Sequence, residues 1–114
     1  MSVNKFRNRK VKFYGMTFDS MKEAHRYNEL LMMLRAGEIN GLERQVPFEL
    51  IPAQKDDDGR VIERAVVYRA DFVYRTKKGK YIVEDVKSSA TKTPEYIIKR
   101  KLLLFRHGIR IQEV

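Results

Sequence analysis

The sequence predicts an α/β protein in which helices flank a mixed sheet, in the order helix, three strands, helix, strand. Apolar residues recur at helical spacing over 20–36 and again over 93–107, and the segment between these two stretches is strand-like. A chain of 114 residues with 43% hydrophobic composition suffices for one domain with a single core. We therefore expect one domain over 19–114, preceded by a basic arm over 1–18.

The basic arm has no acidic residue among its first 12 positions. It is compatible either with a solvated tail or with a segment that becomes ordered on a polyanion. Gly15 lies in the middle of 11–18, a pattern that predicts a short hairpin. The basic residues of the arm are Lys5, Arg7, Arg9, Lys10 and Lys12.

The first helix is bounded by local signals at both ends. Ser20 is a capping residue at the start, and Gly37 follows Ala36 as a stop signal. The residues at helical spacing that form the expected buried stripe are Ala24, Tyr27, Leu30, Leu31 and Leu34.

Glu23 lies at the start of this stripe, because it precedes Tyr27 by four residues and Leu30 by seven. Its position has two interpretations. In the first, Ser20 and Glu23 form a capping box, in which the glutamate accepts from the N–H of Ser20. In the second, Glu23 is an acid directed into a functional site.

An edge strand is expected after Gly41. Residues 43–54 are strand-like but contain Pro47, and a proline inside a strand favours an edge or a bulge. Asp56-Asp57-Asp58-Gly59 then predicts a turn into a second extended run over 61–75. The three adjacent acids also suggest a calcium loop, but the remaining ligand pattern of an EF-hand is missing.

The second and third strands are joined by a turn that sets their register. Lys77-Lys78-Gly79 suits a three-residue hairpin loop, in which Gly79 supplies the left-handed residue. Thr76 then pairs with Lys80. This pairing predicts which residues of the two strands face one another.

Counted outward from that turn, two acids meet. Asp71 lies opposite Asp85, with Cβ atoms roughly 4.5–5.5 Å apart. Like charges at this distance require a proton, a basic partner or a divalent cation. Lys87 is the nearest basic candidate in the sequence.

The second helix starts at Thr93-Pro94-Glu95, which supplies a capping residue, a proline at the first helical position and an acid near the positive end of the helix dipole. Gly108 ends it, and 109–114 predicts a last strand parallel to an earlier one. The basic side is compatible with solvation or with phosphate contact. The expected buried side comprises Ile97, Ile98, Leu102, Leu103, Leu104 and Phe105, and the basic side comprises Lys99, Arg100, Lys101 and Arg106.

Composition favours a polyanionic partner. Twenty-four Lys and Arg against fifteen Asp and Glu give a formal charge of +9, the sign expected for binding phosphates or an anionic membrane surface. No segment approaches the roughly 20 apolar residues of a membrane span, and the N-terminus lacks the apolar run of a signal peptide. We therefore expect a soluble, intracellular protein.

The residues available as metal ligands narrow the class of metal. The chain has no cysteine, which excludes disulfides and thiolate sites, and its two histidines, His25 and His107, are isolated. A zinc site is therefore disfavoured, and any metal is expected to be hard and bound by oxygen.

The element order, with acids on the second and third strands and a lysine two residues after the last acid, resembles the core of the PD-(D/E)XK nuclease superfamily. The motif stands here as Asp71 and Asp85-Val86-Lys87, and Ala70 replaces the proline that names it. Nearly the whole chain looks like a family of small phage and prophage endonucleases, related in pattern to archaeal Holliday-junction resolvases and to the cutting subunit of heteromeric transposases. The stretches that carry this likeness are 18–24, 42–47, 70–72 and 83–87.

The resemblance implies a restriction-endonuclease-like core and a metal-dependent endodeoxyribonuclease. In this interpretation Asp71 and Asp85 hold Mg²⁺ or Mn²⁺ together with the carbonyl of Val86. Lys87 orients or deprotonates the attacking water.

Two further residues enter through the resemblance. Glu23 is favoured as a direct or water-mediated ligand of the metal, with capping as a second role. Gln45 matches a Glu-x-Gln-Pro-like stretch, although Val46 separates it here from Pro47, and we take it as a further catalytic candidate.

The expected substrate is DNA, held through its phosphates by the basic arm and by Lys99, Arg100 and Lys101. Because phosphate contacts fix position but not sequence, selectivity for branched or junction DNA in phage recombination or replication is expected. A junction resolvase cuts two strands symmetrically, so the resemblance also implies a C2 homodimer, acting in the cytoplasm of a bacterial host.

Two alternatives remain open. The chain is either a non-catalytic nucleic-acid-binding module, in which Lys87 and Arg69 neutralise structural acids, or a nuclease subunit that is active only within a larger complex. The sequence also leaves RNA open as the substrate.

Overall fold

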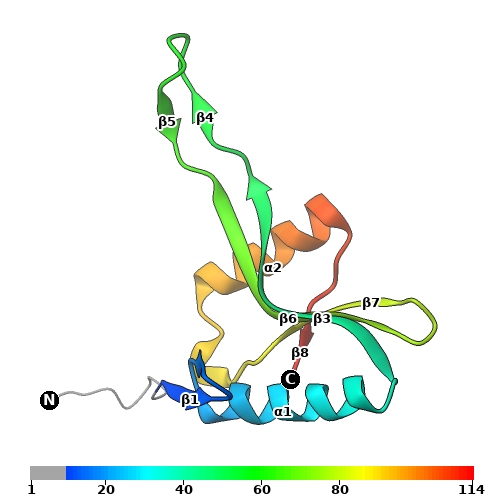
Figure 1. Cartoon of the computed structure of the whole chain (residues 1–114). Helices are drawn as coiled ribbons and strands as arrows, with labels where there is room; N and C mark the ends of the chain where they lie inside the picture. The colour runs from blue at the N-terminus through cyan, green and yellow to red at the C-terminus, as the bar shows by residue number, and fades with distance from the viewer. Residues whose placement is uncertain (1–9) are drawn as a thin grey trace, which may run out of the picture.

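The computed structural model describes residues 10–114, so the predicted contacts of Lys5, Arg7 and Arg9 lie outside the described residues. Its centre is a mixed four-stranded sheet in the order β3-β6-β7-β8 (Figure 1). The β3–β6 and β6–β7 pairs are antiparallel, and β7–β8 is parallel. The strands are β3 (Ile39–Ile51), β6 (Val66–Thr76), β7 (Tyr81–Asp85) and β8 (Gln112–Glu113). The predicted α/β class and the parallel last strand are confirmed.

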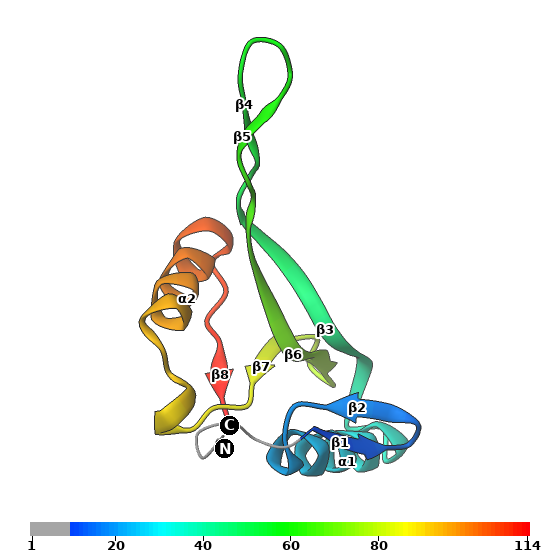
Figure 2. The ribbon, with the colours of Figure 1, turned by 90° about the vertical axis from the view of Figure 1, so that its left-hand side faces the viewer.

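Two helices pack on the sheet through separate apolar clusters (Figure 2). The helix α1 (Met21–Arg35) buries Ala24 and Leu30 against Phe72 and Ile82. The helix α2 (Pro94–His107) buries Tyr96 and Leu103 with Val73 and Val83 of the sheet, and a 3₁₀ turn, η1 (Ser89–Thr91), precedes it. The sheet therefore lies between the two helices.

The predicted helix ends are confirmed. The Ser20 hydroxyl accepts from the Glu23 N–H at 3.1 Å, and the Thr93 hydroxyl accepts from the Tyr96 N–H at 3.1 Å. Gly108 ends α2 in the left-handed conformation, with φ 68°. These caps place the first turn of each helix beside the sheet end that carries the acids.

The predicted register of the central hairpin is also confirmed. Gly79 has a left-handed φ of 83°, and the Thr76 N–H donates to the Lys80 carbonyl at 2.9 Å. The pair Phe72–Glu84 is the last of the β6–β7 ladder, and Asp71 and Asp85 are the next residues of the two strands beyond it.

The edge strand differs from its predicted bounds. It lies at the sheet edge as expected, but it begins at Ile39 and pairs across Pro47 with Arg69. The expected extended run over 61–75 is confirmed except for its continuity, because it is interrupted at 64–65 and only the part from Val66 onward belongs to the central sheet. A separate two-stranded ribbon, β4 (Gln54–Lys55) and β5 (Val61–Glu63), projects from the body as an exposed arm (Figures 1 and 2).

Both predicted apolar stripes are wrong in part. Leu34 is 37% exposed, and Met33 packs on the core in its place. On α2, where Tyr96 and Leu103 are buried, Ile98, Leu104 and Phe105 are exposed. Consecutive residues of a helix cannot all face one sheet, because each turns about 100° from the last.

The N-terminal hairpin is confirmed, with β1 (Val11–Phe13) antiparallel to β2 (Met16–Phe18) and turning at Gly15. Val11, Phe13 and Met16 pack against the cluster on the α1 side of the sheet. Within residues 10–114, neither helix has the length and apolarity needed to cross a membrane.

Candidate active site

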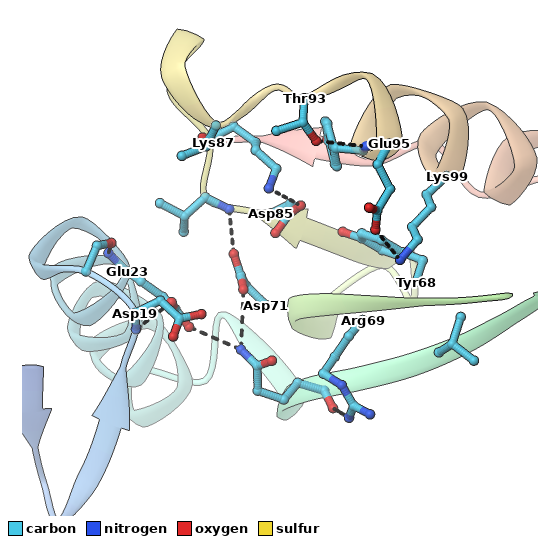
Figure 3. Close-up of a pocket in the computed structure, with 16 residues that line it drawn as sticks. Asp19, Glu23, Tyr68, Arg69, Asp71, Asp85, Lys87, Thr93, Glu95 and Lys99 are labelled. Carbon is cyan, nitrogen blue, oxygen red and sulfur yellow. Dashed lines mark hydrogen bonds and ion pairs between the residues drawn. The ribbon is translucent and has the colours of Figure 1, made fainter. Parts of the chain in front are cut away.

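A cleft of about 570 Å³ lies where the start of α1, β3, β6, the end of β7 and the start of α2 meet. All five predicted catalytic residues line it, and Figure 3 shows the acids converging from three different elements. The five are Glu23, Gln45, Asp71, Asp85 and Lys87. Val86, the sixth predicted residue, also lines the cleft.

Asp71 occupies the middle of the cleft. Its Oδ2 accepts from the Val86 N–H at 2.8 Å, and its Oδ1 accepts from Gln45 Nε2 at 3.3 Å (Figure 3). The first of these bonds continues the antiparallel hairpin beyond its last paired residues. It fixes the Asp71 carboxylate against the chain that leads from Asp85 to Lys87.

Asp85 is only 4% exposed and has little charge compensation. Lys87 Nζ lies 3.2 Å from Asp85 Oδ2, and the same ammonium group lies 4.2 Å from the centre of the Tyr96 ring. Burial, a hydrogen bond with Asp71 and the charge of Asp71 raise the pKa of Asp85 to about 8, and Lys87 opposes this rise. Asp85 therefore carries a proton at neutral pH when no cation is bound.

Glu23 is 3% exposed and lines the cleft, but it does not form the predicted capping box with Ser20. The Glu23 N–H donates to the Ser20 hydroxyl. The Glu23 Oε1 accepts from the Asp19 N–H at 3.2 Å, and not from the Ser20 N–H as predicted. Burial and Asp71 raise the pKa of Glu23 to about 7, and the Asp19 N–H and Arg44 oppose the rise. The side chain therefore supports the helix start and reaches the cleft.

Gln45 joins two of the acids. Its Nε2 donates to Glu23 Oε2 and to Asp71 Oδ1, each at 3.3 Å. The backbone of Gln45 has a φ of 53°, which costs a non-glycine residue about 1–3 kcal/mol. Arg69 Nη1 donates to the Gln45 carbonyl at 3.1 Å. A strained residue that directs its amide at two carboxylates indicates a functional constraint.

The predicted neutralisation of the acids by two basic residues is not found. Lys87 pairs with Asp85, but the Arg69 bond described above goes to the backbone of Gln45. Arg44 approaches Glu23 instead, at 3.8 Å, and its guanidinium lies 4.1 Å from the centre of the Phe18 ring. The described residues therefore place few positive charges against three acids.

Sequence reasoning missed several residues of the cleft, chiefly Tyr68 and Glu95. Glu95 pairs at 3.1 Å with Lys99, which was predicted as a DNA contact but not as a residue beside the acids. Strand alternation places Tyr68 and Asp71 on opposite faces, because they are three residues apart. The structure brings both to one cleft. The position of Thr93-Pro94-Glu95 at a helix start was recognised, but nothing in that pattern indicated that the helix begins beside the acids.

The predicted DNA-contacting residues within 10–114 differ in their surroundings. Lys99 lines the cleft, whereas Arg100 Nη1 lies 3.1 Å from Glu113 and Lys101 is exposed. Lys10 pairs with Asp19 at 3.0 Å, at the rim of the cleft, and Lys12 is exposed on β1.

The acids of the cleft are the type of ligand that binds a divalent cation, although their side chains are not close enough together to surround one. No group of three His, Cys, Asp or Glu side chains within 10–114 stands close enough together to hold a metal. The carboxylates of Asp71 and Asp85 are nevertheless adjacent and short of positive charge, with Asp85 buried and Asp71 half-buried, and hard oxygen donors are what Mg²⁺ and Mn²⁺ prefer. Asp71, Asp85 and Glu23 are the residues that could hold such an ion.

The comparison with protein families assigns the chain to one of them. A family described as "Protein of unknown function (DUF1064)" matches residues 3–112. The chain belongs to the DUF1064 family. No curated protein and no solved structure matches it. The cleft of this DUF1064 chain must therefore be interpreted from its own residues.

Proposed function

We propose that this chain is a metal-dependent endodeoxyribonuclease of the PD-(D/E)XK type, which hydrolyses phosphodiester bonds in branched or junction DNA. The observation that carries the proposal is the pair Asp71 and Asp85, two adjacent carboxylates in a cleft with Lys87. Two adjacent carboxyl groups in a cleft repel each other when both are ionised, and such pairs concentrate at functional sites.

The net charge favours the same substrate. The formal charge of +9 is opposite in sign to a phosphodiester, while the cleft itself is acidic. A basic protein with an acidic cleft attracts a polyanion overall but needs a cation at the place where phosphate enters. A divalent ion would offset the negative charge of both the carboxylates and the phosphate.

A bound Mg²⁺ or Mn²⁺ would polarise the phosphate and lower the pKa of a water molecule, which is the chemistry that a phosphodiester requires. Asp71 and Asp85 would hold the ion, with the Val86 carbonyl as a third ligand and Glu23 as a direct or water-mediated one. The Val86 N–H fixes Asp71 for this task at 2.8 Å.

Lys87 and Gln45 complete the site. Lys87 Nζ lies between Asp85 and the open cleft, where it orients the attacking water and stabilises charge on the phosphate. Gln45 holds the carboxylates of Glu23 and Asp71 at a set separation through its amide. The carboxylates therefore depend on the backbone of β3 for their positions.

Selectivity for branched DNA would come from phosphate contacts, which recognise the shape of the DNA and not its base sequence. Lys99 inside the cleft, Lys101 and Lys12 outside it, and the basic arm provide phosphate contacts without base contacts. A C2 homodimer would present two such clefts to the two strands of a junction. The proposed setting is phage recombination or replication in the cytoplasm of a bacterial host.

The test compares wild type with Asp85→Asn on labelled four-way junction, flap and linear duplex DNA. Each reaction contains Mg²⁺, Mn²⁺ or EDTA, and a mobility-shift assay in EDTA measures binding separately. We expect wild type alone to cut, only with metal, and both proteins to bind. The preferred substrate would then identify the DNA structure that is recognised.

Three results would count against the proposal. Binding without cutting under every condition would favour the non-catalytic module, and cutting that appears only with added host or phage extract would favour a partner-dependent subunit. Cleavage by Asp85→Asn at the wild-type rate would remove the acid pair from the mechanism.

A further inference from the structure

Tyr68 is a buried polar side chain of the cleft that the proposed mechanism does not use. It is 3% exposed, and its hydroxyl has no hydrogen-bond partner within residues 10–114, although it lines the same cleft as Asp85 and Lys87. A buried hydroxyl without a partner opposes folding, so a structure that retains one needs a reason.

The surroundings of the hydroxyl indicate that reason. Figure 3 shows the Tyr68 ring extending toward Asp85, beside the Glu95–Lys99 ion pair. A tyrosine phenol is protonated at neutral pH and can donate a hydrogen bond. The hydroxyl is therefore an available donor directed toward a carboxyl group that can accept.

Asp85 has free acceptor capacity for this donor. An ionised carboxylate offers about four lone-pair positions. Lys87 Nζ lies 3.2 Å from Oδ2 of Asp85 and occupies one of these positions. The remaining positions suffice for both a cation and a phenol.

We propose that Tyr68 is a positioning residue for Asp85: its hydroxyl donates to the Asp85 carboxylate when that carboxylate binds a divalent cation, and it fixes the orientation in which the cation is held. Hydrogen bonds to metal-binding carboxylates commonly have this effect. The inference rests on the proposed function and adds to it a residue outside the motif that carries the resemblance.

The experiment measures Mn²⁺ binding by isothermal titration calorimetry on the full chain without DNA. We expect Tyr68→Phe to weaken Mn²⁺ binding by about 10–100-fold, the effect typical of losing such an outer contact. Thermal unfolding in EDTA should be unchanged or occur at higher temperature, because the substitution removes only an unpaired hydroxyl. Excess Mn²⁺ should restore cleavage by Tyr68→Phe toward the wild-type rate.

Tyr74→Phe is the matched control. Tyr74 lies on the same strand, but its hydroxyl donates to Glu84 on the α1 side of the sheet. We expect this variant to unfold at a lower temperature and to bind Mn²⁺ with wild-type affinity. A merely structural hydroxyl at Tyr68 would behave as Tyr74 does.

The outcomes separate this inference from the proposed function. If wild type binds Mn²⁺ and Tyr68→Phe binds it equally well, the positioning role is wrong and the nuclease proposal stands. If wild type binds no Mn²⁺, the proposed function fails, and the role of Tyr68 fails with it.

Discussion

Two neighbouring acids on β7 differ in how the protein treats their charge. Glu84 is fully buried and faces α1, whereas Asp85 is 4% exposed and faces the cleft. Successive residues of a strand point to opposite faces, so one strand can serve two environments. Under the proposed function, the contrast between them separates an acid that holds the fold together from one that is kept available for a ligand.

The negative charge of Glu84 is compensated by donors at both carboxylate oxygens. Arg26 donates to it twice, Nε to Oε1 at 2.8 Å and Nη2 to Oε2 at 2.6 Å, and the Tyr74 hydroxyl is a third donor. This fork-like pairing is the strong form of an arginine–carboxylate contact. Burial and Glu84 raise the pKa of Tyr74 to about 12, so the tyrosine stays protonated as a donor.

Asp85 has a single cation and a competing anion. Within residues 10–114, Lys87 is its one ion-pair partner, at 3.2 Å, and Asp71 raises its pKa. A buried carboxylate that served only the fold would be expected to have the partners that Glu84 has. The difference indicates that Asp85 is left with room for a partner beyond the described residues.

The largest expected effect on stability follows from Glu84→Gln. This change leaves Arg26 facing a neutral amide in a mostly buried site, and breaking such a pair costs about 3 kcal/mol. Urea unfolding at neutral pH measures the loss. Glu29→Gln removes the exposed partner of the same arginine, and there we expect a loss of less than about 0.5 kcal/mol. Equal losses in the two variants would contradict the contrast drawn above.

The second prediction concerns pH. The pKa of Asp85 is raised to about 8 in the folded state, and that of Glu23 to about 7, so between pH 4 and 8 the folded chain binds more protons than the unfolded chain. Stability in EDTA should therefore fall as pH rises across this window, by several degrees in Tm.

Differential scanning fluorimetry from pH 5 to 8.5 measures this slope. Asp85→Asn should flatten it, and Mg²⁺ should offset the loss at pH 8, because a bound cation replaces the protons. A wild-type Tm that rises steadily over this range in EDTA would show that the acids are not held in protonated form.

The smallest effect concerns the strained backbone at Gln45. Both Gln45→Gly and Gln45→Ala remove the amide that joins Glu23 to Asp71, but only glycine relieves the positive φ of 53°. We expect the glycine variant to be more stable than the alanine variant by about 1 kcal/mol. Urea unfolding of the two proteins measures this difference. Equal stability would mean that the chain relaxes at this residue.

Local rules predicted the site's centre from sequence. The turn at Gly79 and strand alternation together place Asp71 beside Asp85, and both rules act over a few residues. The caps at Ser20 and Thr93 are equally local, and they too were predicted. The part of the site that depends on neighbours in sequence was therefore accessible without a structure.

The parts that were missed depend on tertiary arrangement. Tyr68 reaches the cleft although its spacing from Asp71 places it on the other face of an ideal strand. Phe105 is 88% exposed. The sheet covers only part of the apolar surface of α2, and Phe105 lies outside that part. The arm formed by β4 and β5 arises where β3 and β6 part, and the run over 61–75 gives no signal of that separation.

Single-turnover cleavage of a four-way junction by Glu84→Gln and Asp85→Asn, side by side, tests the central claim most directly. The assay is run with Mg²⁺ at a temperature where both variants are folded by circular dichroism. We predict that Glu84→Gln cuts at nearly the wild-type rate, and that Asp85→Asn is slower by at least about 100-fold, as expected when a charge-stabilising group of the site is lost. Equal rates for the two variants, or a greater loss in Glu84→Gln, would contradict the assignment of Asp85 to chemistry and Glu84 to the fold.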